Sequence, residues 1–112
     1  MRKLLPTVAL LTVLGGCGWT VSGAREAYAQ KWCNYYVRCQ EVGSGKYYST
    51  TDDCLIAERN VALNLWPTSD CEGKISSQGL DICLSAIDNT QCNNLIDQAL
   101  TATKCLKNSI CL

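Results

Sequence analysis

The sequence contains no histidine, and its 10 basic residues are matched by 10 acidic ones. The absence of histidine excludes Ser-His-Asp and Cys-His catalysis, together with every zinc site that needs an imidazole ligand. The formal net charge of zero argues against binding of nucleic acid, because neutralising phosphates takes a surplus of lysine and arginine. A chain of 112 residues has room for one domain.

The N-terminal apolar segment is too short to span a bilayer as a helix, which takes about 20 apolar residues. This segment, Leu4–Leu14, follows the basic residues Arg2 and Lys3. A basic start followed by a short apolar run is typical of a signal peptide. We therefore expect residues 1–16 to be a signal peptide and leave them out of the fold.

The apolar segment ends in Leu14-Gly15-Gly16-Cys17, which resembles the bacterial lipobox. The resemblance implies cleavage before Cys17 and lipidation of this residue, giving a two- or three-chain membrane anchor where a single chain binds only reversibly. The next residue is Gly18, not the aspartate that favours inner-membrane retention, so we expect the outer membrane and leave its face open. The alternatives are an ordinary secretory signal with a chance cysteine, or a buried apolar helix.

Cleavage would also remove Arg2 and Lys3, so that residues 17–112 carry 8 basic and 10 acidic residues. This mildly acidic balance again disfavours nucleic acid, and also anionic lipid headgroups, as partners. Residues 17–23 are expected to form the lipidated cysteine and a short tether. Residues 24–112 are expected to form a cysteine-rich helical domain.

The cysteines after Cys17 are even in number, as expected for a disulfide framework in an exported chain. They allow 105 different pairings, and no two of them have the C-x-x-C spacing of a thioredoxin-type or zinc-ribbon site. We expect structural disulfides, with a metal or redox role as the minor alternative. The eight residues are Cys33, Cys39, Cys54, Cys71, Cys83, Cys92, Cys105 and Cys111.

Apolar periodicity and capping residues predict four helices. The first runs from Ala24 to about Gln40. The second is capped by Thr50 or Thr51 and runs to about Leu65, with two aspartates in its first turn. Residues 43–46 and 67–76 are expected to be loops.

The third helix is expected to be capped by Ser76 or Ser77 and to end at residues 88–89. Thr90 is expected to cap the fourth, and Cys105 and Cys111 to pin the tail. We therefore predict an all-α fold, a small disulfide-stapled bundle of about four short helices. The apolar face of the fourth helix is expected to comprise Cys92, Leu95, Ile96, Ala99 and Leu100.

An aromatic stripe lies along the first predicted helix, and it includes Tyr28, Trp32, Tyr35 and Tyr36. Such a stripe can form a ligand platform, but core packing is the more common role, and we expect core.

The acidic residues suggest no catalytic centre, because none of the ten has an apolar sequence context that would raise its pKa. Asp52 and Asp53 are expected to be helix N-terminal charges, and no run of acids has calcium-loop spacing. We therefore predict no catalytic residue, no metal site and no cofactor. The ten are Glu26, Glu41, Asp52, Asp53, Glu58, Asp70, Glu72, Asp81, Asp88 and Asp97.

Several segments between residues 28 and 111 together form a recognisable pattern: Cys39–Gly43, Gly45–Tyr48, Thr51–Cys54, Asn64–Pro67, Cys71–Ile75, Leu80–Leu84 and Thr90–Asn94. The pattern resembles the natural-product biosynthesis lipoproteins, a family of small bacterial lipoproteins of unknown mechanism. The resemblance implies a link to natural-product biosynthesis, but it supplies no catalytic residues.

Together these features favour a membrane-anchored, non-catalytic accessory lipoprotein linked to natural-product biosynthesis or export. Its expected partners are the membrane, through the lipid anchor, and an envelope protein, a biosynthetic protein or a secreted metabolite. One alternative is a structural cell-envelope lipoprotein with no specific ligand. The other is a small enzyme acting on an exported intermediate.

Overall fold

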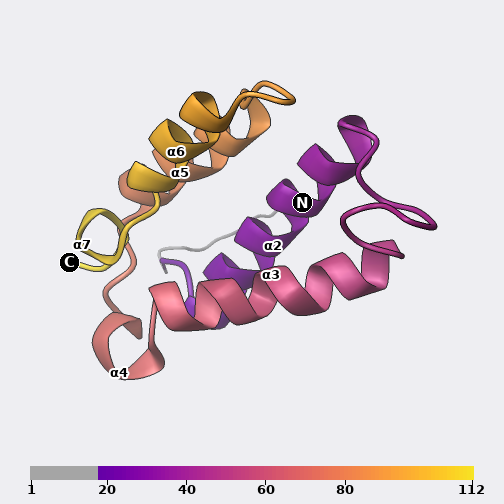
Figure 1. The fold of residues 1–112 in the computed structure, drawn as a ribbon. Coiled ribbons are helices and arrows are strands. Elements are labelled where there is room, and N and C mark those ends of the chain that lie inside the picture. The colour runs from indigo at the N-terminus through magenta and orange to yellow at the C-terminus, as the bar shows by residue number, and fades with distance from the viewer. Residues whose placement is uncertain (1–17) are drawn as a thin grey trace, which may run out of the picture.

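A computed structural model describes residues 18–112, and within them the backbone is helical apart from connecting loops (Figure 1). Six helices are present in this part of the chain: α2 (Val21–Arg38), α3 (Thr51–Leu65), α4 (Thr68–Cys71), α5 (Ser77–Asp88), α6 (Leu95–Thr103) and α7 (Lys107–Ile110). Extended pairing in the same residues is limited to two isolated bridges, Val42 with Tyr48 and Ile75 with Cys111. The predicted all-α fold class is confirmed.

The helices form two pairs that meet along α2. Helices α2 and α3 pack against each other, α5 packs against α2, and α6 and α7 pack on α5. Figure 1 shows α5 and α6 side by side on one side of α2 and α3, with the short α4 at the corner between the pairs. No helix in residues 18–112 is long and apolar enough to cross a membrane.

Four disulfides connect these elements, and they use all eight cysteines of residues 18–112. Cys33–Cys54 joins α2 to α3, and Cys83–Cys105 joins α5 to the segment after α6. Cys71–Cys111 fastens the C-terminal end to α4. Cys39–Cys92 links the end of α2 to the loop before α6. Cys17, the predicted lipidation site, lies outside the described residues.

Trp66, at the end of α3, is the largest side chain that is completely buried. Its indole Nε1 donates a hydrogen bond of 2.9 Å to the carbonyl oxygen of Cys105. Tyr28, Trp32 and Tyr35 of α2 are buried in the same cluster, with Leu80 and Ile87 of α5. The prediction that the aromatic stripe forms core is confirmed for Tyr28, Trp32 and Tyr35, whereas Tyr36 is partly exposed.

Side-chain caps account for the starts of the four longer helices, α2, α3, α5 and α6. Thr50 accepts a hydrogen bond from the Asp53 amide at 3.0 Å, and Ser76 accepts one from the Gly79 amide at 3.0 Å, both as predicted. Thr20 caps α2 through the Gly23 amide, so this helix begins three residues before the predicted Ala24 and the expected tether is shorter.

The prediction for the fourth helix was wrong in its start and in its buried face. Asn94, not Thr90, caps α6, because Thr90 is buried and its hydroxyl bonds the Ala86 carbonyl at 2.7 Å and the Thr101 hydroxyl at 2.6 Å. Thr101 is the residue that α6 buries. The predicted apolar face is instead exposed, at Leu95, Ile96 and Leu100. The predicted loop 67–76 contains the short helix α4.

Candidate functional site

A cavity of about 320 Å³ opens where the end of α2, the loop of residues 43–48 and the start of α6 meet. Three tyrosine rings form much of its wall, and polar side chains complete it. We call this cavity the tyrosine pocket. It is lined by Tyr35, Tyr36, Cys39, Glu41, Tyr47, Asn93, Leu95 and Gln98.

The rings of Tyr36 and Tyr47 stack, with their centroids 5.2 Å apart and their planes 25° apart. The Tyr48 ring packs in a T-shaped arrangement against both rings, at centroid distances of 5.2 Å from Tyr36 and 4.8 Å from Tyr47. Tyr47 nevertheless keeps 67% of its surface exposed. Neighbouring rings therefore support Tyr47 on one side while much of its surface stays free to contact a ligand.

The disulfide Cys39–Cys92 brings two of the pocket's walls together. Each half-cystine is followed by a residue with left-handed backbone, Gln40 at φ 60° and Asn93 at φ 58°. This conformation is uncommon for residues other than glycine and costs roughly 1–2 kcal/mol. It turns the chain sharply after Cys39 toward Glu41, and after Cys92 toward α6.

The loop of residues 43–48 is closed by backbone hydrogen bonds. The amide of Gly43 donates to the Tyr48 carbonyl at 2.8 Å, and the Tyr48 amide donates to the Glu41 carbonyl at 3.1 Å. Gly43 and Gly45 have φ angles of 145° and 77°, which favour glycine. The loop thereby holds Tyr47 against Tyr36.

Polar contacts fix the wall that α6 contributes. The side-chain amide nitrogen of Gln98 donates a hydrogen bond of 2.7 Å to the Tyr35 hydroxyl. The carboxylate of Asp97 accepts from the Gln91 amide at 2.6 Å. By contrast, the carboxylate of Glu41 has no hydrogen bond or ion pair with any other residue of the described chain, and it remains available to a ligand.

Glu58 of α3 contacts the loop of residues 43–48 through Tyr48 and is 6% exposed. Its carboxylate accepts a hydrogen bond of 2.6 Å from the Tyr48 hydroxyl, and burial raises its pKa. Burial and the nearby Glu58 carboxylate also raise the pKa of Tyr36, and raise that of Tyr28 to about 12.

The prediction that no acidic residue has an apolar environment was therefore wrong for Glu58. A helical signal for this burial exists in the sequence: Glu58 is four residues after Cys54 and four before Ala62, so all three share one face of α3. Cys54 and Ala62 are buried as well.

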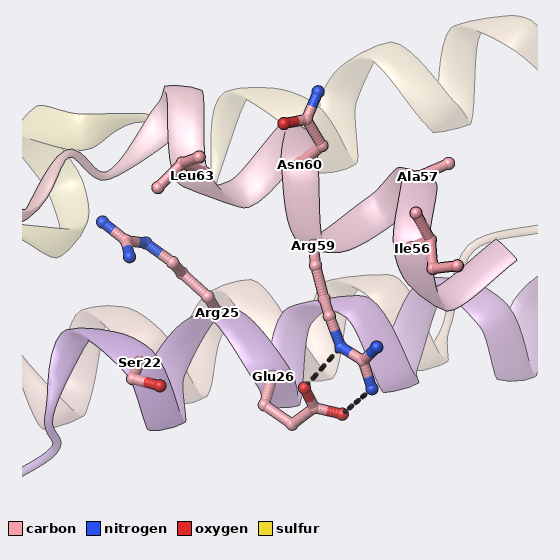
Figure 2. A pocket seen from close by; sticks show the side chains of 8 residues that line it. All are labelled: Ser22, Arg25, Glu26, Ile56, Ala57, Arg59, Asn60 and Leu63. Carbon is pink, nitrogen blue, oxygen red and sulfur yellow. Dashed lines mark hydrogen bonds and ion pairs between the residues drawn. The ribbon is translucent and has the colours of Figure 1, made fainter. Parts of the chain in front are cut away.

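A second cavity, of about 470 Å³, lies between α2 and α3 (Figure 2). Its charged residues are already paired with protein groups. Arg59 bonds the Glu26 carboxylate through two nitrogens, at 2.7 and 3.0 Å, and Arg25 donates to the Trp66 carbonyl at 2.6 Å. These contacts hold α2 against α3, and we interpret this cavity as a gap in the packing between two helices, not as a binding site.

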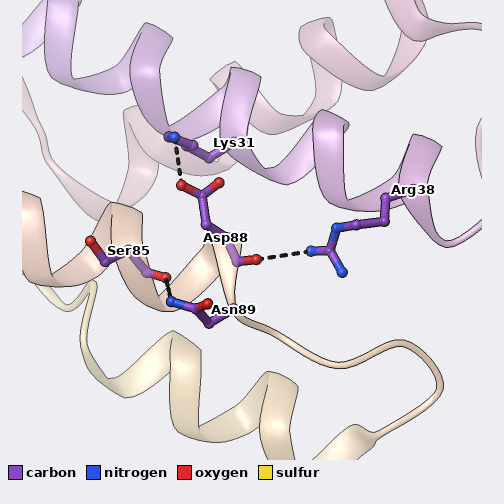
Figure 3. A network of polar contacts seen from close by, with 5 residues as sticks. All are labelled: Lys31, Arg38, Ser85, Asp88 and Asn89. Atoms are coloured by element: carbon purple, nitrogen blue, oxygen red, sulfur yellow. Dashed lines mark hydrogen bonds and ion pairs between the residues drawn. The ribbon is translucent and has the colours of Figure 1, made fainter.

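A third polar cluster joins α2 to the end of α5 (Figure 3). Lys31 forms an ion pair with Asp88 at 2.6 Å, and Arg38 donates to the Thr90 carbonyl at 3.1 Å and the Asp88 carbonyl at 3.4 Å. Cations at a helix C-terminus complement its dipole. The cluster holds the start of the loop that carries Asn93 to the tyrosine pocket.

The acidic residues and cysteines of residues 18–112 form no group of three or more that could hold a metal ion. Asp52 and Asp53 lie in the first turn of α3, as expected for helix N-terminal charges. Sequence reasoning did not select Glu41, Tyr47, Asn93 or Gln98, because they lie on separate segments of the chain that come together only in the folded domain.

The fold defines a small, disulfide-stapled helical domain, and its four disulfides indicate an oxidising, exported environment. Residues 33–112 match a family of unknown function, DUF6184, and the chain belongs to this family. The matched range includes every residue that lines the tyrosine pocket. No curated protein and no solved structure matches the chain.

Proposed function

We propose that this protein is a lipid-anchored, non-catalytic accessory protein linked to natural-product biosynthesis or export, and that it binds a small molecule in the tyrosine pocket. The anchor would be at Cys17 and would hold the domain at the outer membrane. The observation that carries the proposal is an aromatic pocket that a disulfide borders and whose Glu41 carboxylate has no hydrogen-bond or ion-pair partner within residues 18–112.

The pocket favours a metabolite over a partner protein. Its volume of about 320 Å³ falls at the lower end of the range for small-molecule sites, about 300–1,000 Å³. Three segments on which the family resemblance depends, Cys39–Gly43, Gly45–Tyr48 and Thr90–Asn94, contribute residues to this one cavity. This convergence supports a shared binding role for these segments.

The function is tested by comparing secreted metabolites, by mass spectrometry, between the native strain and a clean deletion of the gene. We expect one compound family to disappear or a precursor to accumulate. Complementation with the wild-type gene should restore the profile, whereas Tyr47→Leu should not. Tyr47 is largely exposed, so this substitution should leave the fold intact.

The anchor is tested separately with Cys17→Ser. The wild-type protein should fractionate with outer membranes and carry acyl chains at its N-terminus, and the variant should not. If deletion leaves all metabolites unchanged but weakens the envelope, the structural-lipoprotein alternative replaces this proposal.

A further inference from the structure

We infer that the tyrosine pocket selects a cationic ligand, a compound carrying an alkylated ammonium group. This inference rests on the proposed function, in that it assumes the pocket binds a small molecule. It follows from the charges, ring faces and acceptor atoms that the pocket presents.

The side chains that line the pocket include one carboxylate, Glu41, and no lysine or arginine. Aromatic faces carry the negative end of the ring quadrupole, and they attract cations within about 6 Å of the centroid. Tyr36 and Tyr47, whose rings stack on each other, line the same cavity as Glu41. A cation held there would be attracted by the rings and by the carboxylate together.

The neutral polar groups of the wall point to the same ligand class. The side-chain amide nitrogen of Gln98 donates a hydrogen bond to the Tyr35 hydroxyl, so the side-chain carbonyl oxygen of Gln98 remains as an acceptor. An anion would find an unpaired carboxylate and no basic side chain in the lining. A neutral ligand could stack on the rings, but it would leave the Glu41 charge without a partner.

The nearest basic residues do not neutralise the pocket. Arg38 lies over the Tyr35 ring, 5.3 Å from its centroid, but its nitrogens donate to the carbonyl oxygens of Thr90 and Asp88. Lys46 is exposed on the loop and makes no ion pair with Glu41 among the described residues. Within the described part of the chain, the Glu41 carboxylate is thus a charge of this cavity that no ion pair neutralises.

The test uses three probes of one shape and different charge: choline, the neutral 3,3-dimethylbutan-1-ol and the anionic 3,3-dimethylbutanoate. Each is titrated into the full-length protein in neutral detergent, and binding is followed by the NMR shifts of the Tyr47 and Gln98 amides. We expect choline to bind about tenfold more tightly than the alcohol, and the anion to bind more weakly than both.

Variants assign the selectivity to named groups. Glu41→Gln should reduce choline affinity several-fold, toward the level of the alcohol but not below it, while leaving alcohol affinity unchanged. Tyr47→Phe should keep choline binding, because the ring face is retained, and Tyr47→Leu should lose it. Glu72→Gln, at an exposed carboxylate after α4, is the matched control and should change nothing.

Equal binding of choline and the alcohol would overturn the cationic selectivity, yet it would leave the proposed binding function standing. Failure of all three probes to bind would also overturn the inference. In that case the metabolite comparison with the Tyr47→Leu strain still decides the proposed function on its own.

Discussion

The hydroxyl of Tyr48 donates a hydrogen bond of 2.6 Å to the buried carboxylate of Glu58. This contact ties the loop of residues 43–48, which borders the tyrosine pocket, to α3. One hydrogen bond from a protein donor offsets only part of the free energy that burying a charged carboxylate costs. Burial therefore raises the pKa of Glu58. A buried acid with a raised pKa makes the free energy of unfolding depend on pH.

The first prediction concerns that pH dependence. The pKa of Glu58 in the folded state lies above its ordinary value of 4.5, so the native state binds this proton more tightly than the unfolded chain. The stability gained in this way is complete below pH 4.5 and is lost as pH rises through the folded-state pKa. Glu58→Gln keeps an acceptor for Tyr48 without the charge. We expect the variant to melt at a higher temperature than the wild type at pH 7, with the difference shrinking toward pH 4.

Thermal unfolding followed by circular dichroism between pH 4 and pH 8 measures this. Glu26→Gln provides the control of opposite sign, because hydrogen bonds from Arg59 lower the pKa of Glu26. The stability from Glu26 is present above its ordinary pKa and is lost as pH falls through the lowered one. Parallel pH profiles for the wild type and Glu58→Gln would contradict the assignment.

The second prediction ranks two disulfides. Cys39–Cys92 spans 53 residues and Cys83–Cys105 spans 22. In the chain-entropy model, loops of these lengths give about 4 and about 3 kcal/mol of stabilisation. In urea denaturation, the double variant Cys39→Ser/Cys92→Ser should therefore lose more free energy of unfolding than the double variant Cys83→Ser/Cys105→Ser. The opposite ranking would show that loop length does not govern these bonds.

Much of the helical framework was predictable from local sequence signals. Thr50 and Ser76 cap the helices assigned to them, and Leu65 ends α3 shortly before Pro67. Capping depends on residues within one turn, so a single sequence contains the information it needs. The eight cysteines likewise indicated a stapled domain, although not which pairs form.

The prediction failed where tertiary contacts decide the outcome. The exposed Leu95, Ile96 and Leu100 have the periodicity of a buried face, but α6 turns Thr101 toward the interior, where it meets Thr90. The tyrosine pocket also depends on long-range contacts, because it is assembled from parts of the chain between residues 35 and 98. Local periodicity does not specify which of the possible disulfides brings these parts together.

The third prediction concerns the buried indole of Trp66. Trp66→Phe would remove the donor that bonds the Cys105 carbonyl and would leave a small cavity. We expect a loss of roughly 2–4 kcal/mol in the free energy of unfolding, from the unpaired acceptor and the lost packing. Trp19→Phe, at a partly exposed tryptophan, is the control and should change stability by less than about 0.5 kcal/mol. Equal effects in urea denaturation would show that the buried bond contributes little.

The last prediction reverses a familiar helix rule at Gly79 of α5. Glycine to alanine in a helix usually stabilises it by up to about 1 kcal/mol. Here an added Cβ would collide with the backbone carbonyl oxygen of Ser109 in α7. Helix α7 cannot readily move away, because the backbone amide of Ser76 donates a hydrogen bond of 2.7 Å to the Ile110 carbonyl and the Cys71–Cys111 disulfide holds the chain end.

We therefore expect Gly79→Ala to destabilise the domain by roughly 1–3 kcal/mol in urea denaturation. Gln78→Ala, at the exposed neighbouring position, is the control and should be nearly neutral. An increase in stability for Gly79→Ala would mean that α5 and α7 are not held this closely.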